Sequence, residues 1–305
     1  TLTALNINTI QELAYLLKSS PKELTRLTKK AKYYYNPTKR EIKGKIRYLD
    51  VPRGRLLKVQ KSINKLLQRL DLPYDIVAYR RGKSCKDNAF IHKDSRVIAN
   101  IDIKDFYPSI YHKKVYDAFI YLGCSPDVSK VLTELTTING SVPQGAPSSP
   151  MVANLVSIPF VNRISCFKHY GYKTSAYSDD VTISGKNRVD RMKLKAENII
   201  SQEGFNINKN KSRVIPEDEE QVVTGVRIKS GRLEAPTDKI ADIMNDIRYL
   251  ENHVGLDYSS LCRRIEGKLN HVKLVNPGQF KMLLKEYKSV RNDLKTIDRI
   301  VKYRA

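Results

Sequence analysis

Two adjacent carboxylates, Asp179 and Asp180, follow Tyr177 and Ser178 between two apolar-rich stretches in the middle of this chain. Short runs of strand-type residues separated by Ser and Asp are typical of two strands joined by a tight turn. The pattern therefore predicts a β-hairpin with both carboxylates at its tip. Asp is also favoured in turns because it hydrogen-bonds to its own backbone, so the pair alone indicates no more than a turn.

A third carboxylate, Asp102, indicates that this turn is part of a metal-binding site. Asp102 directly follows the apolar segment 97–101, and we expect it at or near the end of a second strand. Three carboxylates from two elements can hold two divalent metal ions, which clamp the attacking and leaving oxygens of a phosphoryl displacement. Mg²⁺ suits such a site because it prefers octahedral oxygen coordination and keeps waters and substrate phosphates among its ligands.

The charge distribution points to a polyanionic partner. The 305-residue chain carries a formal net charge of +23. Residues 1–100 hold 23 basic and 8 acidic side chains (+15), residues 101–250 hold 20 and 18 (+2), and residues 251–305 hold 12 and 6 (+6). Basic ends around a nearly neutral centre are the distribution expected if the ends bind phosphates and the centre binds metal.

The cysteines and the hydropathy bear on the class of protein. Cys85, Cys124, Cys166 and Cys262 lack the paired spacing of zinc or redox motifs, so we expect reduced, buried or inert thiols in a cytosolic protein. No stretch approaches the roughly 18 to 20 apolar residues of a membrane span. The basic N-terminus also lacks the apolar core of a secretory signal.

The fold class follows from the order of the expected elements. Two capping boxes, at Thr9–Glu12 and Ser20–Glu23, predict helices in the first 35 residues. The later expected elements, in chain order, are a basic hairpin in 39–52, a helix in 56–70, a strand in 97–103, helices in 113–122 and from about 150, the hairpin at Tyr177, a helix in 190–203, a strand near 221–228, and helices after Pro236. Strands that alternate with helices predict an α+β sheet of the ferredoxin-like kind.

Two further groups of residues are candidates for nucleotide binding. Tyr107 lies five positions after Asp102, where an aromatic ring could lie under the sugar of a nucleotide; core packing is the equally good alternative for this ring. Gln144 offers a donor and an acceptor, and Gly145 lets the backbone approach a ligand closely. A Pro/Gly loop by itself would indicate only a turn.

In combination these motifs are much more specific. Asp102 with Tyr107, the Gln144-Gly145 loop, the Tyr-Ser-Asp-Asp tetrad and Lys211, in this order, resemble the palm motifs of reverse transcriptases. Two accessory motifs, at 88–92 (Asn-Ala-Phe-Ile-His) and at 223–225 (Val-Thr-Gly), resemble those of bacterial retron reverse transcriptases, as does the stretch 265–287. The matches span about residues 40–230. Two departures stand out: Ser178 replaces the commonest Ala, and Tyr107 replaces a frequent Phe.

The resemblance implies a right-hand polymerase, with fingers in residues 1–100, a ferredoxin-like palm in 101–230 and a small helical thumb in 231–305. It also implies three sets of site residues. Two Mg²⁺ ions are held by Asp102, Asp179, Asp180 and the backbone carbonyl of Ile103. Nucleotide binding falls to Arg47, Asp105, Tyr107, Gln144, Gly145 and Lys211, where Lys211 either positions the triphosphate or protonates the leaving pyrophosphate. RNA recognition falls to Asn88, His92, Thr224 and Gly225, with local structure as the alternative for His92.

The implied function is RNA-directed DNA synthesis in the bacterial cytoplasm. A retron enzyme copies its own structured non-coding RNA into single-stranded DNA from deoxynucleoside triphosphates. It is primed by the 2′-hydroxyl of a guanosine and yields a branched RNA–DNA hybrid. Retron membership also suggests a separate effector protein and a role in antiphage defence. The alternatives are another bacterial reverse transcriptase of the intron or diversity-generating type, a catalytically silent nucleic-acid-binding scaffold, and a metal-dependent nuclease.

Overall fold

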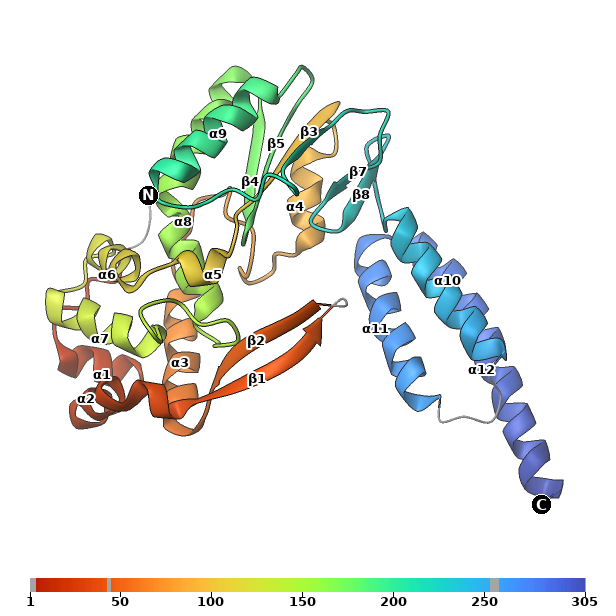
Figure 1. The fold of residues 1–305 in the computed structure, drawn as a ribbon, viewed down its shortest axis with the longest axis horizontal. Helices are drawn as coiled ribbons and strands as arrows, with labels where there is room; N and C mark the ends of the chain where they lie inside the picture. Colours follow the sequence, from red (N-terminus) through yellow and green to blue (C-terminus); the bar gives the residue numbers. More distant parts are fainter. Residues whose placement is uncertain (1–3, 43–44, 253–257, 305) are drawn as a thin grey trace. The chain divides into compact units, whose positions relative to one another are not determined.

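The chain forms two compact units in the computed structural model, which describes residues 4–42, 45–252 and 258–304 (Figure 1). Unit 1 comprises Thr1–Ser84 with Val97–Val214, and unit 2 comprises Cys85–Arg96 with Ile215–Ala305. Both units combine helices with strands, so the predicted α+β class is confirmed.

The N-terminal helices of unit 1 begin at their predicted caps. The hydroxyl oxygens of Thr9 and Ser20 each accept a hydrogen bond, at 3.2 Å, from the backbone N–H three residues further on. These bonds satisfy amide groups that have no partner within the helix, which fixes where each helix starts. The helices are α1 (Ile10–Leu16) and α2 (Pro21–Lys30), followed by the 3₁₀ helix η1 (Ala31–Tyr34).

A β-hairpin and a helix follow, and the hairpin is longer than predicted. It starts at Tyr35 instead of residue 39, and that tyrosine is buried, with its hydroxyl accepting a 2.7 Å hydrogen bond from Gln60 Nε2. This contact with the following helix extends the first strand beyond what its sequence alone indicates. The elements are β1 (Tyr35–Ile42), β2 (Lys45–Pro52) and α3 (Gly54–Leu67).

A four-stranded sheet forms the centre of unit 1, with the strand order β4-β5-β3-β6. β5 lies between β4 and β3 and is antiparallel to both. With the intervening helices, the chain order is that of a β-α-β-β-α-β unit. The elements are β3 (Val97–Asp102), α5 (Phe106–Ser109), α6 (His112–Tyr121), α7 (Pro126–Thr136), α8 (Ser149–Ser165), η2 (Cys166–Tyr170), β4 (Lys173–Tyr177), β5 (Asp180–Gly185), α9 (Asp190–Gln202) and β6 (Arg213–Ile215).

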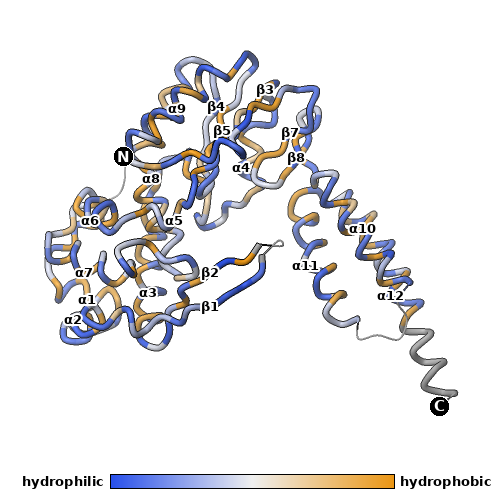
Figure 2. The backbone as a smooth tube through the Cα atoms, viewed as in Figure 1, coloured by the Kyte–Doolittle hydropathy of each residue, from blue (hydrophilic) through white to orange (hydrophobic). Residues whose placement is uncertain are grey.

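Helix α8 supplies much of the core beneath this sheet. It packs against β4 and α9, and most of its residues are buried, so it is apolar around most of its circumference (Figure 2). A helix that is hydrophobic on all sides is expected inside a core and not on a surface. Phe160 of this helix meets Phe205 edge-on, with the ring centroids 5.7 Å apart. Residues of α8, β3 and β5 share one apolar core, which supports the strands that carry Asp102 and Asp180.

Unit 2 contains a second, smaller core. Helix α4 packs against a three-stranded sheet, where a single strand at about 221–228 was predicted; the Thr224-Gly225 turn divides that segment into two antiparallel strands. The chain after Pro236 is helical, as predicted, and its helices α10, α11 and α12 enclose their own apolar cluster, which includes Ile247, Ile265 and Leu283. The elements are α4 (Cys85–His92), β7 (Gln221–Val223), β8 (Val226–Lys229), β9 (Arg232–Glu234), α10 (Thr237–Asn252), α11 (Ser259–Val275) and α12 (Pro277–Arg304).

The cysteines agree only in part with the sequence expectation of reduced, buried or inert thiols. All four cysteines are free, but Cys166 is exposed, so burial does not apply to every thiol. In the described part of the chain, none of the helices combines the length and the apolar character needed to span a bilayer.

Candidate active site

The tip of the β4–β5 hairpin carries the two adjacent carboxylates, as predicted. Tyr177 pairs with Asp180, so Ser178 and Asp179 form a two-residue turn. Ser178 has a positive φ of 61° and Asp179 does not, which is the sign pattern of a type II′ turn. Such turns match the natural twist of the flanking strands, and this one holds Asp179 at the very end of the hairpin.

The third carboxylate lies directly across the sheet. Asp102 is the partner of Asp180 in the antiparallel β3–β5 pair, and directly opposed residues have Cβ atoms about 4.5–5.5 Å apart. The N–H of Ile103 donates to the carbonyl oxygen of Asp179 at 2.9 Å, which ties the end of β3 to the hairpin turn. Sheet register therefore brings Asp102 to the adjacent pair Asp179 and Asp180, which lies more than 70 positions further along the sequence.

Lys211 joins this group, although it comes from the loop after α9. Its Nζ lies 2.7 Å from Oδ1 of Asp102, whose side chain is almost fully buried. This hydrogen bond is the main cause that raises the pKa of Lys211 above its usual value, and the charges of Asp179 and Asp180 raise it further. One ammonium group therefore faces all three carboxylates.

The acidic group nevertheless remains electrostatically crowded. Burial raises the pKa of Asp179 above its ordinary value, and the charge of Asp102 raises it further. The N–H of Asp179, the charge of Lys211 and the hydroxyl of Ser178 act in the opposite direction without cancelling the effect. Crowding of like charges in a partly buried place is a recurrent property of functional sites.

The donors present fit an oxygen-ligated divalent cation. All the predicted ligands offer carboxylate or carbonyl oxygens, which are the donors that Mg²⁺ prefers. The ammonium of Lys211 already lies against Asp102, so this position attracts a cation. No three His, Cys, Asp or Glu side chains within the described residues already surround a single metal position. The metal ligands would therefore have to converge further, and Lys211 competes with a metal for the same carboxylate.

Tyrosines line the site next to the hairpin tip. Tyr107 is half-buried, and its hydroxyl donates to the hydroxyl of Tyr79 at 3.3 Å. Burial is the main cause that raises the pKa of the Tyr107 phenol, and Tyr79 adds to the effect, so the phenol stays neutral at physiological pH. The Tyr79 ring lies 6.3 Å from the ring of Tyr177, measured between centroids. The predicted sugar-facing ring is therefore held close to the carboxylates.

The Gln144-Gly145 loop contacts the N-terminal hairpin. The carbonyl oxygen of Gln144 accepts a 2.8 Å hydrogen bond from the N–H of Asp50 in β2. Gly145 has φ +104°, and a Cβ on it would lie 3.2 Å from Cβ of Leu49. Only glycine combines this backbone conformation with such a close approach. The loop and β2 thus form one surface within unit 1.

Two of the predicted nucleotide-binding residues, Arg47 and Asp105, are exposed side chains. Arg47 is exposed on β2, where it pairs across the hairpin with Arg40. Like charges directly opposite each other destabilise a strand pair, so this surface favours an anionic partner. Asp105 is exposed and adopts a left-handed backbone conformation, with φ 49° and ψ 44°. Among the described residues, neither side chain has a hydrogen bond or ion pair with the acidic group.

The predicted RNA-recognition residues come together in unit 2. Asn88 on α4 is fully buried, and its Nδ2 donates to the Thr224 hydroxyl at 3.3 Å, which in turn donates to the Cys85 carbonyl at 3.4 Å. Thr224 and Gly225 have φ values of 46° and 77°, the sign pattern of a type I′ turn. A β-branched residue rarely adopts this conformation, so the hydroxyl bridge is maintained against backbone strain.

Lys239 and His271 hold the second residue of this turn, Gly225. The Gly225 carbonyl oxygen lies 3.0 Å from Lys239 Nζ and 3.3 Å from His271 Nε2. A Cβ on Gly225 would lie only 2.7 Å from Lys239 Nζ, so this glycine leaves room for the contact. His92, like Asn88, is fully buried. In this structure the two motif residues face the protein interior, and the exposed ring of Phe90 lies between them in sequence.

Sequence reasoning missed Tyr79, Ser212 and the pair Lys239 and His271. Ser212 accepts a 3.0 Å hydrogen bond from the N–H of Asp102, and Tyr79 binds the hydroxyl of Tyr107. An aromatic residue just before the basic 80–83 loop was the available signal for Tyr79. Its positive φ of 58° could not be read from the residue type.

Comparison with known proteins points to one class of enzyme. Residues 27–228 match the family described as reverse transcriptase (RNA-dependent DNA polymerase). The retron Se72 reverse transcriptase of Salmonella heidelberg is 30% identical, with 95% of this chain and 82% of the relative aligned. The retron Ec86 reverse transcriptase of Escherichia coli is 27% identical (91% and 88%), and the retron Mx65 reverse transcriptase of Myxococcus xanthus is 29% identical (80% and 62%).

Proposed function

This chain belongs to the retron reverse transcriptases, which are RNA-dependent DNA polymerases, and we propose that it copies the structured non-coding RNA of its own retron into single-stranded DNA. The observation that carries the proposal is the antiparallel pairing of β3 with β5, which sets Asp102 opposite Asp180 and beside Asp179. A strand register of this kind specifies the position of a carboxylate more firmly than a flexible loop would.

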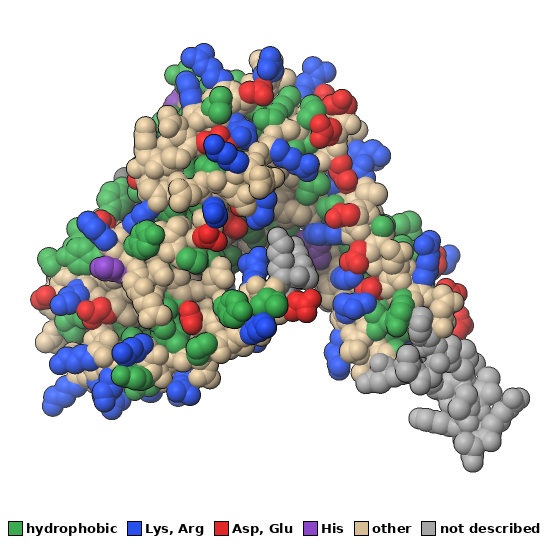
Figure 3. Space-filling model, in the orientation of Figure 1, with side chains coloured by type: hydrophobic (Ala, Val, Ile, Leu, Met, Phe, Trp, Pro, Cys, Tyr) green, Lys and Arg blue, Asp and Glu red, His purple; other side chains and the backbone are tan. Residues whose placement is uncertain are grey.

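The polymerase has the right-hand arrangement, with fingers in residues 1–100, a palm in 101–230 and a helical thumb in 231–305. The β-α-β-β-α-β order of the central sheet supports the palm assignment. The basic surface of the N-terminal hairpin supports the fingers, and the three helices after Pro236 support the thumb. Lys and Arg side chains are spread over the visible surface of both units, as a protein that binds a long polyanion requires (Figure 3).

Two Mg²⁺ ions are the proposed cofactors. Asp102 and Asp179 would hold both ions, Asp180 would tune the site from beside them, and the carbonyl of Ile103 would be a further ligand. When bound, such a pair stabilises the attacking and leaving oxygens of the nucleotidyl transfer. The ammonium of Lys211 shifts from Asp102 to the triphosphate, where it positions the phosphates or gives a proton to the leaving pyrophosphate. The hydrogen bond between Lys211 and Asp102 places the ammonium ready for that exchange.

The remaining residues bind the incoming deoxynucleoside triphosphate. The Tyr107 ring lies under the sugar and excludes a 2′-hydroxyl, and the Gln144-Gly145 loop frames the nascent base pair. Arg47 neutralises charge that develops on the triphosphate, since charged donors placed at such oxygens stabilise a transition state. Asp105 contacts the triphosphate through a metal ion or its backbone. The contact of the Gln144 carbonyl with Asp50 of β2 supports joint action of loop and hairpin.

Synthesis is primed from the 2′-hydroxyl of a guanosine in the non-coding RNA, which yields a branched RNA–DNA hybrid in the bacterial cytoplasm. Asn88, His92, Thr224 and Gly225 serve recognition of that RNA. Because Asn88 and His92 are buried, they act by holding α4 and the turn in place, so that exposed neighbours such as Phe90 meet the RNA. A separate effector protein and a role in antiphage defence complete the proposal.

The experiment that tests this function replaces one metal ligand. Asp179→Asn keeps the size of the side chain but removes its charge, so we expect primer extension with Mg²⁺ and deoxynucleotides to fall by about 1,000-fold or more, while RNA binding persists. Asp117→Asn is the matched control because this exposed carboxylate pairs with Lys113 on α6. Extension by Asp179→Asn at the wild-type rate would exclude the assignment. Mg²⁺-dependent shortening of the nucleic acid without longer products would indicate a nuclease instead.

A further inference from the structure

The segment from Asp75 to Tyr79 is fixed against the strand that leads to the hairpin tip. The N–H of Ala176 donates to the Asp75 carbonyl at 2.7 Å, and the N–H of Val77 donates to the Ala176 carbonyl at 2.9 Å. These bonds form a short parallel bridge with β4. Because both segments then run in the same direction, Tyr79 arrives beside Tyr177, the last residue of β4.

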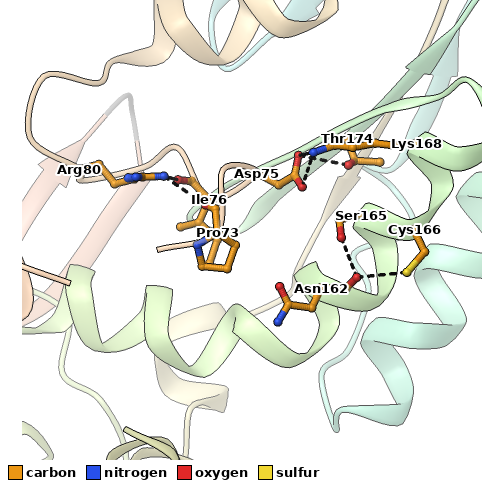
Figure 4. A network of polar contacts seen from close by, with 9 residues as sticks. All are labelled: Pro73, Asp75, Ile76, Arg80, Asn162, Ser165, Cys166, Lys168 and Thr174. Atoms are coloured by element: carbon orange, nitrogen blue, oxygen red, sulfur yellow. Dashed lines mark hydrogen bonds and ion pairs between the residues drawn. The ribbon is translucent and has the colours of Figure 1, made fainter. Parts of the chain in front are cut away.

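Buried polar contacts anchor the start of this segment. Asp75 is 3% exposed, and its carboxylate accepts hydrogen bonds from Lys168 Nζ at 2.7 Å and from the Thr174 hydroxyl at 3.3 Å (Figure 4). Arg80, just past Tyr79, folds back and donates from Nη1 to the carbonyls of Pro73 and Ile76 at 3.1 and 3.2 Å. The loop is therefore held on both sides of Tyr79.

The backbone of Tyr79 itself is held in a rare conformation. Its φ is +58°, which a bulky residue seldom adopts, and strain of this kind persists only where surrounding contacts impose it. Gln68 Nε2 donates to the Tyr79 carbonyl at 2.6 Å, and the buried Asn154 donates from Nδ2 to the Ala78 carbonyl at 2.8 Å. Gln68, at the end of α3, and Asn154, on α8, thus fix the backbone that carries the Tyr79 ring.

The ring is aimed at the sugar-facing side of the site. Its hydroxyl lies 3.3 Å from the hydroxyl of Tyr107, and its ring is tilted by 36° to that of Tyr177. Tyr79 is 41% exposed, so burial of its own surface does not account for the strained, multiply held backbone. The held backbone instead presents the ring to the two site tyrosines.

We propose that Tyr79 is a positioning residue for sugar discrimination, whose hydroxyl keeps the Tyr107 ring in the place where it excludes a ribose 2′-hydroxyl. The inference rests on the proposed function, because it assumes that Tyr107 lies under the sugar. A phenol that is hydrogen-bonded at its far end cannot tilt freely about its side-chain bonds. A ring without that bond yields more easily to a bulkier sugar.

The test compares deoxyribonucleotide with ribonucleotide incorporation. Single-turnover efficiencies for dGTP and GTP are measured on one RNA template with one DNA primer, and their ratio is the readout. Tyr79→Phe removes only the hydroxyl, and we expect the ratio to fall about fivefold, the scale of one neutral hydrogen bond. Tyr74→Phe is the control. It removes a hydroxyl from the residue just before this segment, whose ring lies under the Lys168 ammonium, and it should leave the ratio unchanged.

A second variant removes the hydrogen bond between Tyr79 and Tyr107 from the Tyr107 side. The test then does not depend on the correct folding of Tyr79→Phe alone. Tyr107→Phe should lower the ratio at least as much as Tyr79→Phe, because it also removes the hydrogen bond between the Tyr107 hydroxyl and Ser178. The double variant should lower the ratio no further than Tyr107→Phe alone, because the hydrogen bond with Tyr79 is then already absent. An unchanged ratio in Tyr79→Phe, or two effects that multiply in the double variant, would overturn the inference. A change in overall stability alone would lower both efficiencies together and leave their ratio intact.

A separate variant distinguishes failure of the inference from failure of the proposed function. Tyr107→Ala removes the whole ring, and it should lower the ratio far more than either Phe variant. If Tyr107→Ala keeps the wild-type ratio, the assignment of Tyr107 to the sugar fails, and the role of Tyr79 fails with it. If Tyr107→Ala lowers the ratio while Tyr79→Phe does not, only the inference about Tyr79 is wrong.

Discussion

Two clusters of polar side chains in this molecule are built in opposite ways. They are the acidic group of unit 1 (Asp102, Asp179 and Asp180) and the motif cluster of unit 2 (Asn88, His92, Thr224 and Gly225). Around Asp102 and Asp179, like charges are crowded at strand ends, with one ammonium from Lys211 facing them. Around the buried Asn88 and the partly buried Thr224, neutral groups bond to one another and to the backbone, and only Oδ1 of Asn88 lacks a hydrogen-bond partner within this described cluster. The first arrangement costs folding free energy, and the second supplies it.

The difference indicates what each region does. Crowded carboxylates are typical of functional sites, where a bound cation supplies the positive charge that offsets their repulsion. A neutral network presents no charge for a ligand to neutralise and instead fixes the geometry of the elements that carry it, here α4 and the β7–β8 turn. We therefore expect changes in the acidic group to affect chemistry more than stability, and changes in the motif cluster to affect stability and RNA choice.

The largest effect that sharpens this comparison is expected at Lys211. Lys211→Ala removes the only ammonium bound to Asp102 among the described residues, and we expect nucleotide incorporation to fall about 100-fold, the lower range for a positioned proton donor. Lys209→Ala, in the same exposed loop, is the control and should keep nearly full activity. Steady-state incorporation assays measure both. An activity loss no larger than that of the control would assign Lys211 to a solvated surface charge.

A conservative variant separates the two roles left open for Lys211. Lys211→Arg keeps a positive charge near Asp102, but arginine does not release a proton at accessible pH. If Lys211 only positions phosphates, this variant should recover most of the activity that Lys211→Ala loses. If Lys211 protonates the leaving pyrophosphate, the arginine variant should be as slow as the alanine variant.

The next effect is expected at Asn88. Asn88→Ala leaves the hydroxyl of Thr224 without its buried donor, so the free energy of unfolding should fall by about 2 kcal/mol. Urea unfolding measures this, with Asn198→Ala on the exposed side of α9 as control. DNA synthesis should suffer more on the cognate RNA than on an artificial primer–template, and His92→Ala should behave likewise. Equal losses on both substrates would assign these residues to folding alone.

The parts of this structure that were predictable depend on local signals. The Tyr177 hairpin and the strand before Asp102 follow from apolar runs and turn residues, and sheet pairing then brings the carboxylates together. The caps at Thr9 and Ser20 are equally local. The order of the expected elements was sufficient to predict the α+β fold class.

The parts that were not predictable depend on contacts between distant residues. The Thr224-Gly225 turn was read through as a single strand, because Thr favours strands and its hydroxyl bridge to Asn88 is a tertiary contact. The place of Tyr79 likewise depends on anchors at Asp75 and Asn154. Burial of His92 was not visible in the sequence, so its motif role had two open interpretations.

A smaller effect is expected at Thr224, where the hydroxyl and the β-branch can be separated. Thr224→Ala removes the hydroxyl bridge and should lower the free energy of unfolding by about 1 kcal/mol. Thr224→Ser keeps the hydroxyl and lacks the γ-methyl group, which adds to the cost of φ +46°, so it should be as stable as the wild type or slightly more so. Urea unfolding of the two variants measures this. If both variants are equally destabilised, the hydroxyl bridge does not hold the turn.

The smallest effect concerns the pH dependence of stability at Asp179. Burial and the charge of Asp102 raise the pKa of this carboxyl above its ordinary value of 3.8, so the folded state favours its protonated form. Its favourable contribution is complete below the ordinary pKa and is lost as pH rises through the raised pKa of the folded state. Unfolding free energies of the wild type should therefore fall relative to Asp179→Asn as pH increases from about 3.5 towards 7. Parallel curves for the two proteins would contradict a crowded acidic group. Adding Mg²⁺ at pH 7 should stabilise the wild type more than the variant, because the ion supplies the charge that the carboxylates lack.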